Sequence, residues 1–350
     1  MNKPKRLEKG DTIALVNPAG LPPLRFRHFI PLMKQYLEKE GFFVKLYLAE
    51  ETATAERLGN VFTEAWLDSE VQAVFPICGS SVIFEVLPCL YSDLLKQKKV
   101  IFCGSSVLSS LSIWLSQHAQ VVTFFGPHIP FIHSCAPQRE NEFTVQSFWD
   151  MIMWKKGKAN NMSSVHERHN FFSVNDSNTQ DIKIKNLYLR PDLIKDKQKR
   201  VALFFSLTEK VVSGKTFCIT MECLLSMARL GLLPSVTNSI IFTETMDWNL
   251  EQIKNTFEEL SRLDAFHGAN AVFITAFTER TDRKELDFPE LRDPAKVKIL
   301  CSSISERIQL PVLYGFPMGH GSYKLTLPQN ISCSINPEDG SVYLLERPVA

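Results

Sequence analysis

Residues 100–107 read VIFCGSSV, and this stretch indicates the class of fold. An apolar run typical of a buried strand ends before Gly104, which lets the chain turn, and a helical pattern begins near Val107. A strand followed at once by a turn and a helix is the unit from which parallel sheets are built. A serine in this turn, Ser105 or Ser106, is expected to stand above the sheet, near the N–H groups that open the helix.

The same alternation of short apolar runs and amphipathic helical patterns extends over the first 150 residues or so. We expect strands at 12–16, 42–48, 73–77, 100–103 and 121–125, and helices at 24–41, 56–68, 82–96 and 107–118. Strands that alternate with helices form βαβ units, so this region predicts a parallel sheet with helices on both faces.

Residues 157–183 break the alternation, because they are rich in asparagine, serine and charge and show no apolar period. We therefore expect an N-terminal α/β domain over 1–156, a linker over 157–183, and a smaller C-terminal domain of mixed α/β character over 184–350. In the C-terminal domain we expect strands at 201–205, 216–220, 239–243, 271–275 and 312–314, helices at 224–233, 250–266 and 295–308, and a hairpin turn at 336–340.

The charge balance and the cysteines exclude several classes of function. Lysine plus arginine is 39 and aspartate plus glutamate is 38, which gives no electrostatic reason to expect nucleic acid or an anionic membrane as a partner. The N-terminus lacks the pattern of a signal peptide, and no apolar run is long enough to span a membrane, so we expect a cytoplasmic protein. The eight cysteines are scattered, which favours free thiols over disulfides or a zinc site, and we expect no metal and no cofactor.

Ser106 is the candidate nucleophile. Its turn resembles a nucleophile elbow, although the second glycine of GxSxG is missing. Two other interpretations stay open: Ser105 or Ser106 can act only as a helix N-cap, and Cys103 can be the nucleophile instead. Cys103 occupies the last apolar position of the strand, so we expect its side chain to point into the sheet.

Two further positions follow predicted strands and carry polar side chains. Glu244 comes directly after the strand at 239–243, and the alternative is a solvated glutamate that helps to cap the next helix. His320 lies between glycines after the strand at 312–314, where the backbone can turn tightly and leave the imidazole approachable. Among the other histidines, His128 is the main competitor.

Together these positions supply a serine, a glutamate and a histidine in chain order. Histidine, with a pKa near neutral, takes the proton of the serine, and the carboxylate fixes the tautomer of the ring and stabilises the imidazolium. Catalytic groups in α/β sheets collect at the carboxyl ends of strands, which is where all three are predicted to lie.

The order of several short motifs resembles the serine peptidases of the LD-carboxypeptidase family, which also contains the microcin C self-immunity peptidases. No single motif is specific, but their order over more than 300 residues is. The motifs are LEKGDTIALVNPA at 7–19, VQAVF at 71–75, VLP at 86–88, GSS at 104–106, FGP at 125–127, SGK at 213–215, IFTET at 241–245, and GH at 319–320 followed by LTLP at 325–328.

The resemblance implies a fold and a set of residue roles. The N-terminal domain would resemble class I glutamine amidotransferases, the active site would lie between the two domains, and the protein would form a homodimer. By matching position, Ser106 would be the nucleophile, with Glu244 and His320 as its partners. The oxyanion would be bound by the N–H of Val107 and by an N–H of the loop at Gly79 and Ser80.

The resemblance also implies a substrate class. The family hydrolyses an amide bond next to a free carboxylate, typically releasing terminal D-alanine from a cytosolic murein peptide during peptidoglycan recycling. The alternatives are an acyl-nucleotide amide hydrolase of the microcin-immunity type and an inactive member that binds a peptide or partner. The family's Arg-Gly-Gly-Tyr-Gly loop stands here as 78–82, CGSSV, and its Gly-Gly-Asn/Cys-Leu element as 221–224, MECL, which implies an altered substrate preference.

Overall fold

The structure is a computed structural model whose chain divides into two compact units. It describes residues 1–22, 24, 27–127, 142–154, 172–174, 182–184, 205–275, 288–320, 324–338 and 340–350. Unit 1 comprises Met1–Lys156, Leu325–Gln329 and Pro348–Ala350, and unit 2 comprises Gly157–Lys324 and Asn330–Arg347.

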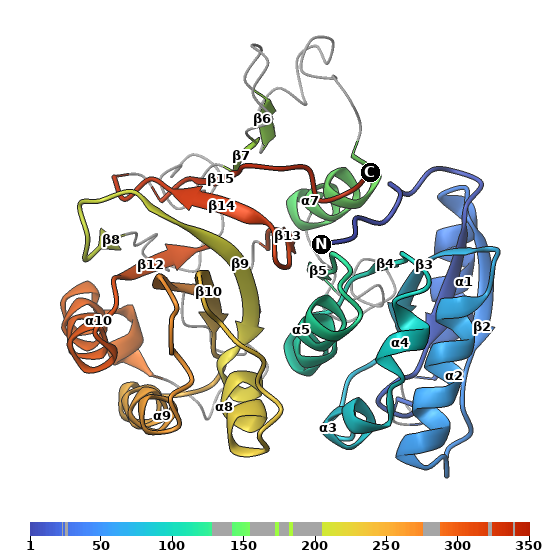
Figure 1. The fold of residues 1–350 in the computed structure, drawn as a ribbon, viewed down its shortest axis with the longest axis horizontal. Helices are drawn as coiled ribbons and strands as arrows, with labels where there is room; N and C mark the ends of the chain where they lie inside the picture. The colour runs from blue at the N-terminus through green and yellow to red at the C-terminus, as the bar shows by residue number, and fades with distance from the viewer. Residues whose placement is uncertain are drawn as a thin grey trace. The chain divides into compact units, whose positions relative to one another are not determined.

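Unit 1 is built on a four-stranded sheet with the strand order β2-β1-β3-β4 (Figure 1). All three of its strand pairs are parallel, which confirms the predicted parallel sheet. Every residue of β1 is buried, as expected for a parallel strand covered on both faces. The strands are β1 (Thr12–Val16), β2 (Phe43–Tyr47), β3 (Val71–Pro76) and β4 (Ile101–Phe102).

The strand expected at 121–125 is shorter and pairs differently. Only β5 (Phe124–Phe125) is a strand, and its ladder partner is the antiparallel β13 (Leu327–Pro328). A single parallel bridge, from Cys103 to Phe124, links β5 to the end of β4.

Aromatic side chains fix the helices of unit 1 against its sheet. The ring of Phe62 on α2 lies 6.0 Å from that of Phe102 on β4, and the ring of Phe148 on α7 lies 5.6 Å from that of Phe75 on β3. All four side chains are fully buried, and burying rings of this size contributes much of the core's stability. The helices are α1 (Phe29–Lys39), α2 (Ala55–Leu67), α3 (Ile83–Val86), α4 (Ser92–Leu95), α5 (Ser109–His118) and α7 (Glu142–Met153), with 3-10 turns at Leu87–Cys89 and Ser106–Leu108.

The single helix expected at 82–96 is wrong. The chain forms α3, then the 3-10 turn Leu87–Cys89, and begins α4 only at Ser92. Pro88 has no N–H to donate and its ring clashes with the preceding helical turn, so it ends α3. Leu90 then adopts an extended backbone before α4 starts.

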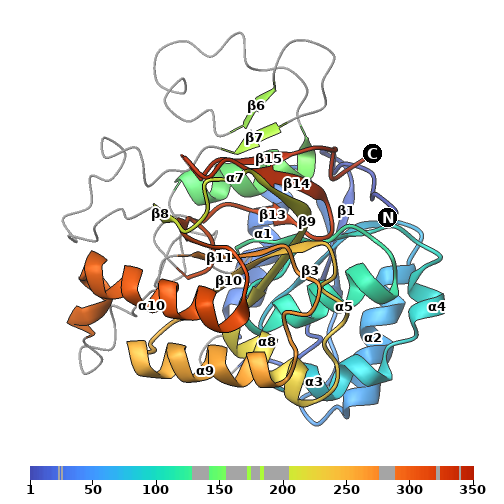
Figure 2. The same ribbon diagram turned by 60° about the vertical axis from the view of Figure 1, so that its left-hand side comes forward.

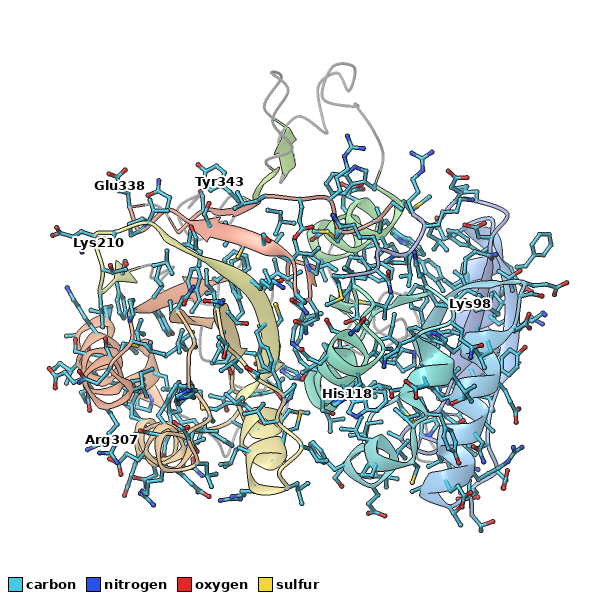
Figure 3. The ribbon with its side chains drawn as sticks, in the orientation of Figure 1. Lys98, His118, Lys210, Arg307, Glu338 and Tyr343 are labelled. Atoms are coloured by element: carbon cyan, nitrogen blue, oxygen red, sulfur yellow. The ribbon has the colours of Figure 1, made fainter. Side chains whose placement is uncertain are left out.

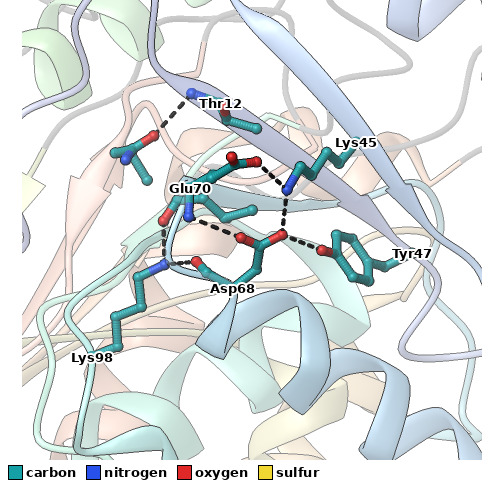
Figure 4. A network of polar contacts seen from close by, with 8 residues as sticks. Thr12, Lys45, Tyr47, Asp68, Glu70 and Lys98 are labelled. Carbon is teal, nitrogen blue, oxygen red and sulfur yellow. Dashed lines mark hydrogen bonds and ion pairs between the residues drawn. The ribbon is translucent and has the colours of Figure 1, made fainter.

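A network of polar contacts around Asp68 closes the end of α2 (Figure 4). The Asp68 carboxylate accepts from Lys45 Nζ at 2.6 Å and from the hydroxyl of Tyr47, both on β2. These hydrogen bonds lower the pKa of Asp68 to about 2. Lys98 Nζ donates to the backbone carbonyls of Asp68 and Val71, so one side chain ties together the two ends of the α2–β3 loop.

Unit 2 contains a nine-stranded mixed sheet with the order β6-β7-β15-β14-β9-β10-β11-β12-β8. The pairs joining β9 to β12 are parallel, and the flanking pairs are antiparallel. This confirms the predicted mixed character of the second half. The strands are β6 (Phe172–Val174), β7 (Ile182–Ile184), β8 (Phe205–Ser206), β9 (Val212–Thr220), β10 (Ser239–Glu244), β11 (Ala271–Thr275), β12 (Val312–Phe316), β14 (Ser332–Ile335) and β15 (Val342–Leu344).

Three helices lie side by side in unit 2 (Figures 1 and 2). The middle one, α9, begins with a capping box in which Asn249 and Gln252 each accept from the other's backbone N–H. The predicted tail hairpin is also confirmed, because β14 and β15 pair antiparallel across the turn. The helices are α8 (Met221–Arg229), α9 (Leu250–Arg262) and α10 (Pro294–Ile308), with a 3-10 turn at Pro289–Arg292.

Most of the segment expected as a linker, 157–183, lies outside the described residues. Its described parts are β6 and the first two residues of β7, which pair with each other. Of the strand expected at 201–205, only Phe205 is described, and it opens β8. Among the helices of the described ranges, none has both the length and the apolar character needed to cross a bilayer.

Candidate active site

Ser106 has a strained backbone at the turn between β4 and α5. Its φ is 53°, in the left-handed region that residues other than glycine rarely adopt. It is the first residue of the 3-10 turn Ser106–Leu108, and Ser105 is the N-cap, so Ser106 is not itself the cap. Ser109 Oγ donates to the Ser106 carbonyl at 2.6 Å, which holds the turn to the start of α5.

The loop at 78–82 packs directly against this turn. A Cβ added to Gly79 would come within 2.6 Å of Val107 Cγ1, so only glycine fits there without a shift. Ser80 Oγ donates to the Ala19 carbonyl at 2.7 Å, and Cys78 Sγ donates to the Gly20 carbonyl at 3.0 Å. Unit 1 therefore brings Gly79 close to Val107 and ties the neighbouring residues of the loop to the loop that follows β1.

Glu244 is the last residue of β10, and its side chain is 0% exposed. This excludes the alternative of a solvated strand-end glutamate. A buried carboxylate is costly unless it is paired, so its partner is informative. Oε1 is 2.8 Å from His320 Nδ1, while Oε2 has no hydrogen-bond partner among the described residues.

His320 follows β12 by four residues and keeps 28% of its side chain exposed. Because a carboxylate can only accept, Nδ1 donates the proton in its contact with Glu244. The neutral ring then carries its lone pair on Nε2, the nitrogen that can take a proton from a nucleophile. Unit 2 thus brings together two of the three predicted catalytic residues.

Opposing influences act on the His320 ring. Burial, the largest, lowers the pKa of His320, whereas the charge and the hydrogen bond of Glu244 raise it. The net direction is upward from the ordinary value. A base with a raised pKa is a stronger proton acceptor, but it is neutral only at correspondingly higher pH.

Comparison with known proteins gives the family. Residues 13–126 match the LD-carboxypeptidase N-terminal domain, and residues 213–335 match the LD-carboxypeptidase C-terminal domain. The chain belongs to the LD-carboxypeptidase family. One relative, a probable murein peptide carboxypeptidase of Bacillus subtilis, is 34% identical over 134 residues. That match spans 36% of this chain and 40% of the relative.

Solved structures with the same fold cover nearly the whole chain. An MccF-like protein from Bacillus anthracis has a TM-score of 0.73 at 17% identity, covering 98% of this chain and 99% of its own. The microcin C7 self-immunity protein MccF has a TM-score of 0.74 at 16% identity, with 100% of both chains covered. A muramoyltetrapeptide carboxypeptidase from Oxalobacter formigenes has a TM-score of 0.67 at 19% identity, covering 95% of this chain and 97% of its own.

The other described histidines of this family member are poor candidates for the base. His118 is the last residue of α5, the ten-residue helix that follows the Ser106 turn, and lies about 14 Å along the helix axis from its first residue. Figure 3 labels His118. His267 is 79% exposed and pairs with Asp264. His28 precedes α1 and lies against the ring of Phe29. His128, the main competitor in the sequence, lies outside the described residues.

Cys103 is buried, as the sequence predicted, with 3% of the residue exposed. Burial raises its pKa, which keeps the thiol protonated and a poor nucleophile. Within the described ranges, no cluster of three or more histidine, cysteine, aspartate or glutamate residues could hold a metal ion.

The sequence left one neighbour of the site without a role. Glu222 belongs to the MECL element, from which we expected only an altered substrate preference, yet its Oε1 accepts a hydrogen bond from Thr245 Oγ1 at 2.8 Å, and Thr245 adjoins Glu244. In the sequence, the indication was that IFTET at 241–245 matches the family whereas MECL at 221–224 departs from it. Only the register of β9 against β10 shows that the two stretches meet.

Proposed function

We propose that this protein is a serine peptidase that hydrolyses an amide bond near a free carboxylate and releases the terminal D-amino acid of a murein peptide. The observation that carries the proposal is the left-handed backbone of Ser106, with φ 53°. Strain of this kind costs about 1–3 kcal/mol, and strained residues cluster at active sites. In serine hydrolases with a nucleophile elbow, a sharp strand-to-helix turn exposes the nucleophile in this way.

His320 and Glu244 supply the base and its partner in the proposed reaction. Ser106 Oγ attacks the carbonyl carbon of the substrate, and His320 Nε2 takes the hydroxyl proton. Glu244 accepts from Nδ1 at 2.8 Å, so it stabilises the imidazolium that forms. His320 then gives the proton to the leaving amine, and water, activated by the same ring, hydrolyses the acyl-enzyme and restores Ser106.

The proposed oxyanion donors are the N–H of Val107 and an N–H of the Gly79–Ser80 loop. The tight packing of Gly79 against Val107 supports this assignment, because it brings the two backbone segments close together. Backbone donors fixed in advance at the developing oxyanion are often the largest single contribution to catalysis of acyl transfer.

The substrate class rests on the family and on the Bacillus subtilis relative, a probable murein peptide carboxypeptidase. An acyl-nucleotide amide is the second candidate substrate. The microcin C7 self-immunity protein MccF favours it, because this neighbour of the same fold has been solved in complex with aspartyl sulfamoyl adenosine.

We also propose that the protein works in the cytoplasm, in peptidoglycan recycling, as a homodimer. None of the seven described cysteines forms a disulfide, which fits a reducing compartment. The oligomeric state is measured directly by light scattering on the eluting peak of a size-exclusion column.

The test incubates the purified protein with the murein tetrapeptide L-Ala-D-Glu-meso-diaminopimelate-D-Ala and detects released D-alanine by mass spectrometry. Ser106→Ala is the matched control, and an acyl-nucleotide amide is offered in parallel. Release that needs Ser106 supports the carboxypeptidase. Cleavage of the nucleotide amide alone moves the assignment to the second substrate. No cleavage of either, and no labelling of Ser106 by an active-site serine probe, overturns the proposal in favour of a binding protein.

A further inference from the structure

Three parallel strands of unit 2 end at the same edge of its sheet, and a charged or titratable side chain follows each. Glu244 ends β10, and His320 follows β12. On the other side of β10, strand β9 runs straight into α8, whose first turn carries Glu222. The register pairs Glu244 with Thr220, the N-cap of α8, so the start of that helix lies beside the end of β10.

A hydrogen bond joins Glu222 to the backbone segment that carries Glu244. Thr245 Oγ1 donates to Glu222 Oε1 at 2.8 Å, and Thr245 is only 1% exposed. The Glu222 carboxylate is therefore hydrogen-bonded to the residue that directly follows Glu244 in the chain. Truncating Glu222 would remove this hydrogen bond from a buried hydroxyl, which costs stability.

Three ionisable groups act on the His320 ring from different elements. Glu244 at the end of β10 raises the pKa of His320, the ammonium of Lys324 lowers it, and Glu222 on α8 raises it by a smaller contribution. In the other direction, burial and the charge of Glu244 raise the pKa of Glu222. Glu244 hydrogen-bonds the ring directly, whereas Glu222 acts on it through its charge alone.

We propose that Glu222 is a positioning residue of this site: it anchors Thr245 and, through its charge, stabilises the protonated form of His320. The inference rests on the proposed function for its meaning in catalysis, but its physical content concerns the folded protein alone. It assigns a role to a residue at which this chain departs from the family's Gly-Gly-Asn/Cys-Leu element.

Two substitutions distinguish the hydrogen bond of Glu222 to Thr245 from the effect of its charge on His320. Glu222→Gln keeps an oxygen that can accept from Thr245 but removes the charge. Glu222→Ala removes both. If the charge acts on the imidazole, both variants lower the pKa of His320, whereas only Glu222→Ala lowers the melting temperature. If Glu222 has only a structural role, the pKa of His320 should stay unchanged in Glu222→Gln.

The experiment titrates the protein labelled with ¹⁵N-histidine and follows the imidazole nitrogens by NMR, without any substrate. The His320 signal is assigned from its loss in His320→Gln. Glu306→Gln, on the exposed face of α10, is the control that removes a charge from unit 2 away from the site. The expected result is a downward shift of the His320 pKa in Glu222→Gln that exceeds the change in Glu306→Gln. If the pKa of His320 is the same in Glu222→Gln as in Glu306→Gln, the proposal is overturned.

A kinetic arm then connects this role to turnover. The acid limb of kcat/KM should move to lower pH in Glu222→Gln by the same amount as the NMR pKa, because that limb reports the protonation of the base in the free enzyme. The two failures are distinct. An inactive protein whose NMR shift appears contradicts only the proposed function, and an active protein without the shift contradicts only the role of Glu222.

Discussion

Gly319 lies so close to Glu244 that no side chain fits between them. A Cβ added at residue 319 would overlap Cγ and Cδ of Glu244, and it would lie 2.8 Å from Oε2. The backbone of Gly319 is also left-handed, with φ 88°. The glycine before His320 therefore has two separate reasons to be glycine, and one of them is the buried carboxylate that holds the imidazole.

Gly319→Ala should displace Glu244 and break its alignment with His320. We expect a loss of hydrolysis of about 10²-fold, since misplacing a reacting group by about 1 Å has an effect of that size. The measurement is kcat/KM together with the melting temperature.

Gly231→Ala is the control for backbone strain alone. Gly231 has φ 67°, and a Cβ there would meet nothing within 4 Å. It should lose about 1 kcal/mol of stability and keep its activity. Equal activity losses in the two variants would show that strain, and not contact with Glu244, is the cause.

Ser106→Gly and Ser106→Ala should both be inactive but should differ in stability. Glycine adopts the left-handed backbone without strain. The free energy of unfolding of Ser106→Gly should therefore exceed that of Ser106→Ala by about 1 kcal/mol, or roughly 2–4 °C in melting temperature. Ser116, inside α5, supplies the contrast: its buried hydroxyl has no hydrogen-bond partner among the described residues, and alanine should be more stable there than glycine. The same order at both sites would contradict strain at Ser106.

The elements that the sequence predicted well are those in which local pattern and tertiary packing agree. β1 and β11 have their predicted bounds, and α10 differs by one residue at its start, because each begins after a clear turn or capping residue and carries a regular apolar pattern. The prediction of one helix over 82–96 was wrong, because it followed the apolar period of the segment and did not allow for the break at Pro88.

The sequence indicated candidate residues for the site but none of the contacts between them. Strand ends identified Glu244 and His320, and a short motif identified Ser106, yet the hydrogen bond between Glu244 and His320 joins residues 76 positions apart. The partnership of Glu222 with Thr245 depends on the register of β9 against β10, which no local pattern encodes. The register between strands distant in sequence could therefore not be predicted from the sequence alone.

Asp68→Asn should destabilise unit 1 at neutral pH. The folded pKa of Asp68, about 2, is below its unfolded value, so the carboxylate contributes stability above the unfolded pKa, and that stability is lost as pH falls toward 2. We expect a loss of about 2 kcal/mol at pH 7 that shrinks between about pH 4 and pH 2, measured by urea unfolding. Asp93→Asn, whose side chain is 92% exposed, should change little at any pH. A loss in Asp68→Asn that stays constant with pH would rule out the charge as its cause.

Glu244→Gln should change both the size and the pH dependence of hydrolysis. In the wild type, activity should rise with pH through the raised pKa of His320, so the acid limb of kcat/KM should lie above the ordinary histidine value of about 6.5. The glutamine cannot supply the charge that raises this pKa, while burial still lowers it, so the acid limb should move to lower pH. The rate itself should fall by about 10⁴-fold, the size of the loss when a triad carboxylate becomes an amide and the ring takes the wrong tautomer. Glu306→Gln, remote from the ring on α10, should leave both the rate and the limb unchanged. An acid limb that stays in place in Glu244→Gln would mean that a group other than His320 controls the reaction.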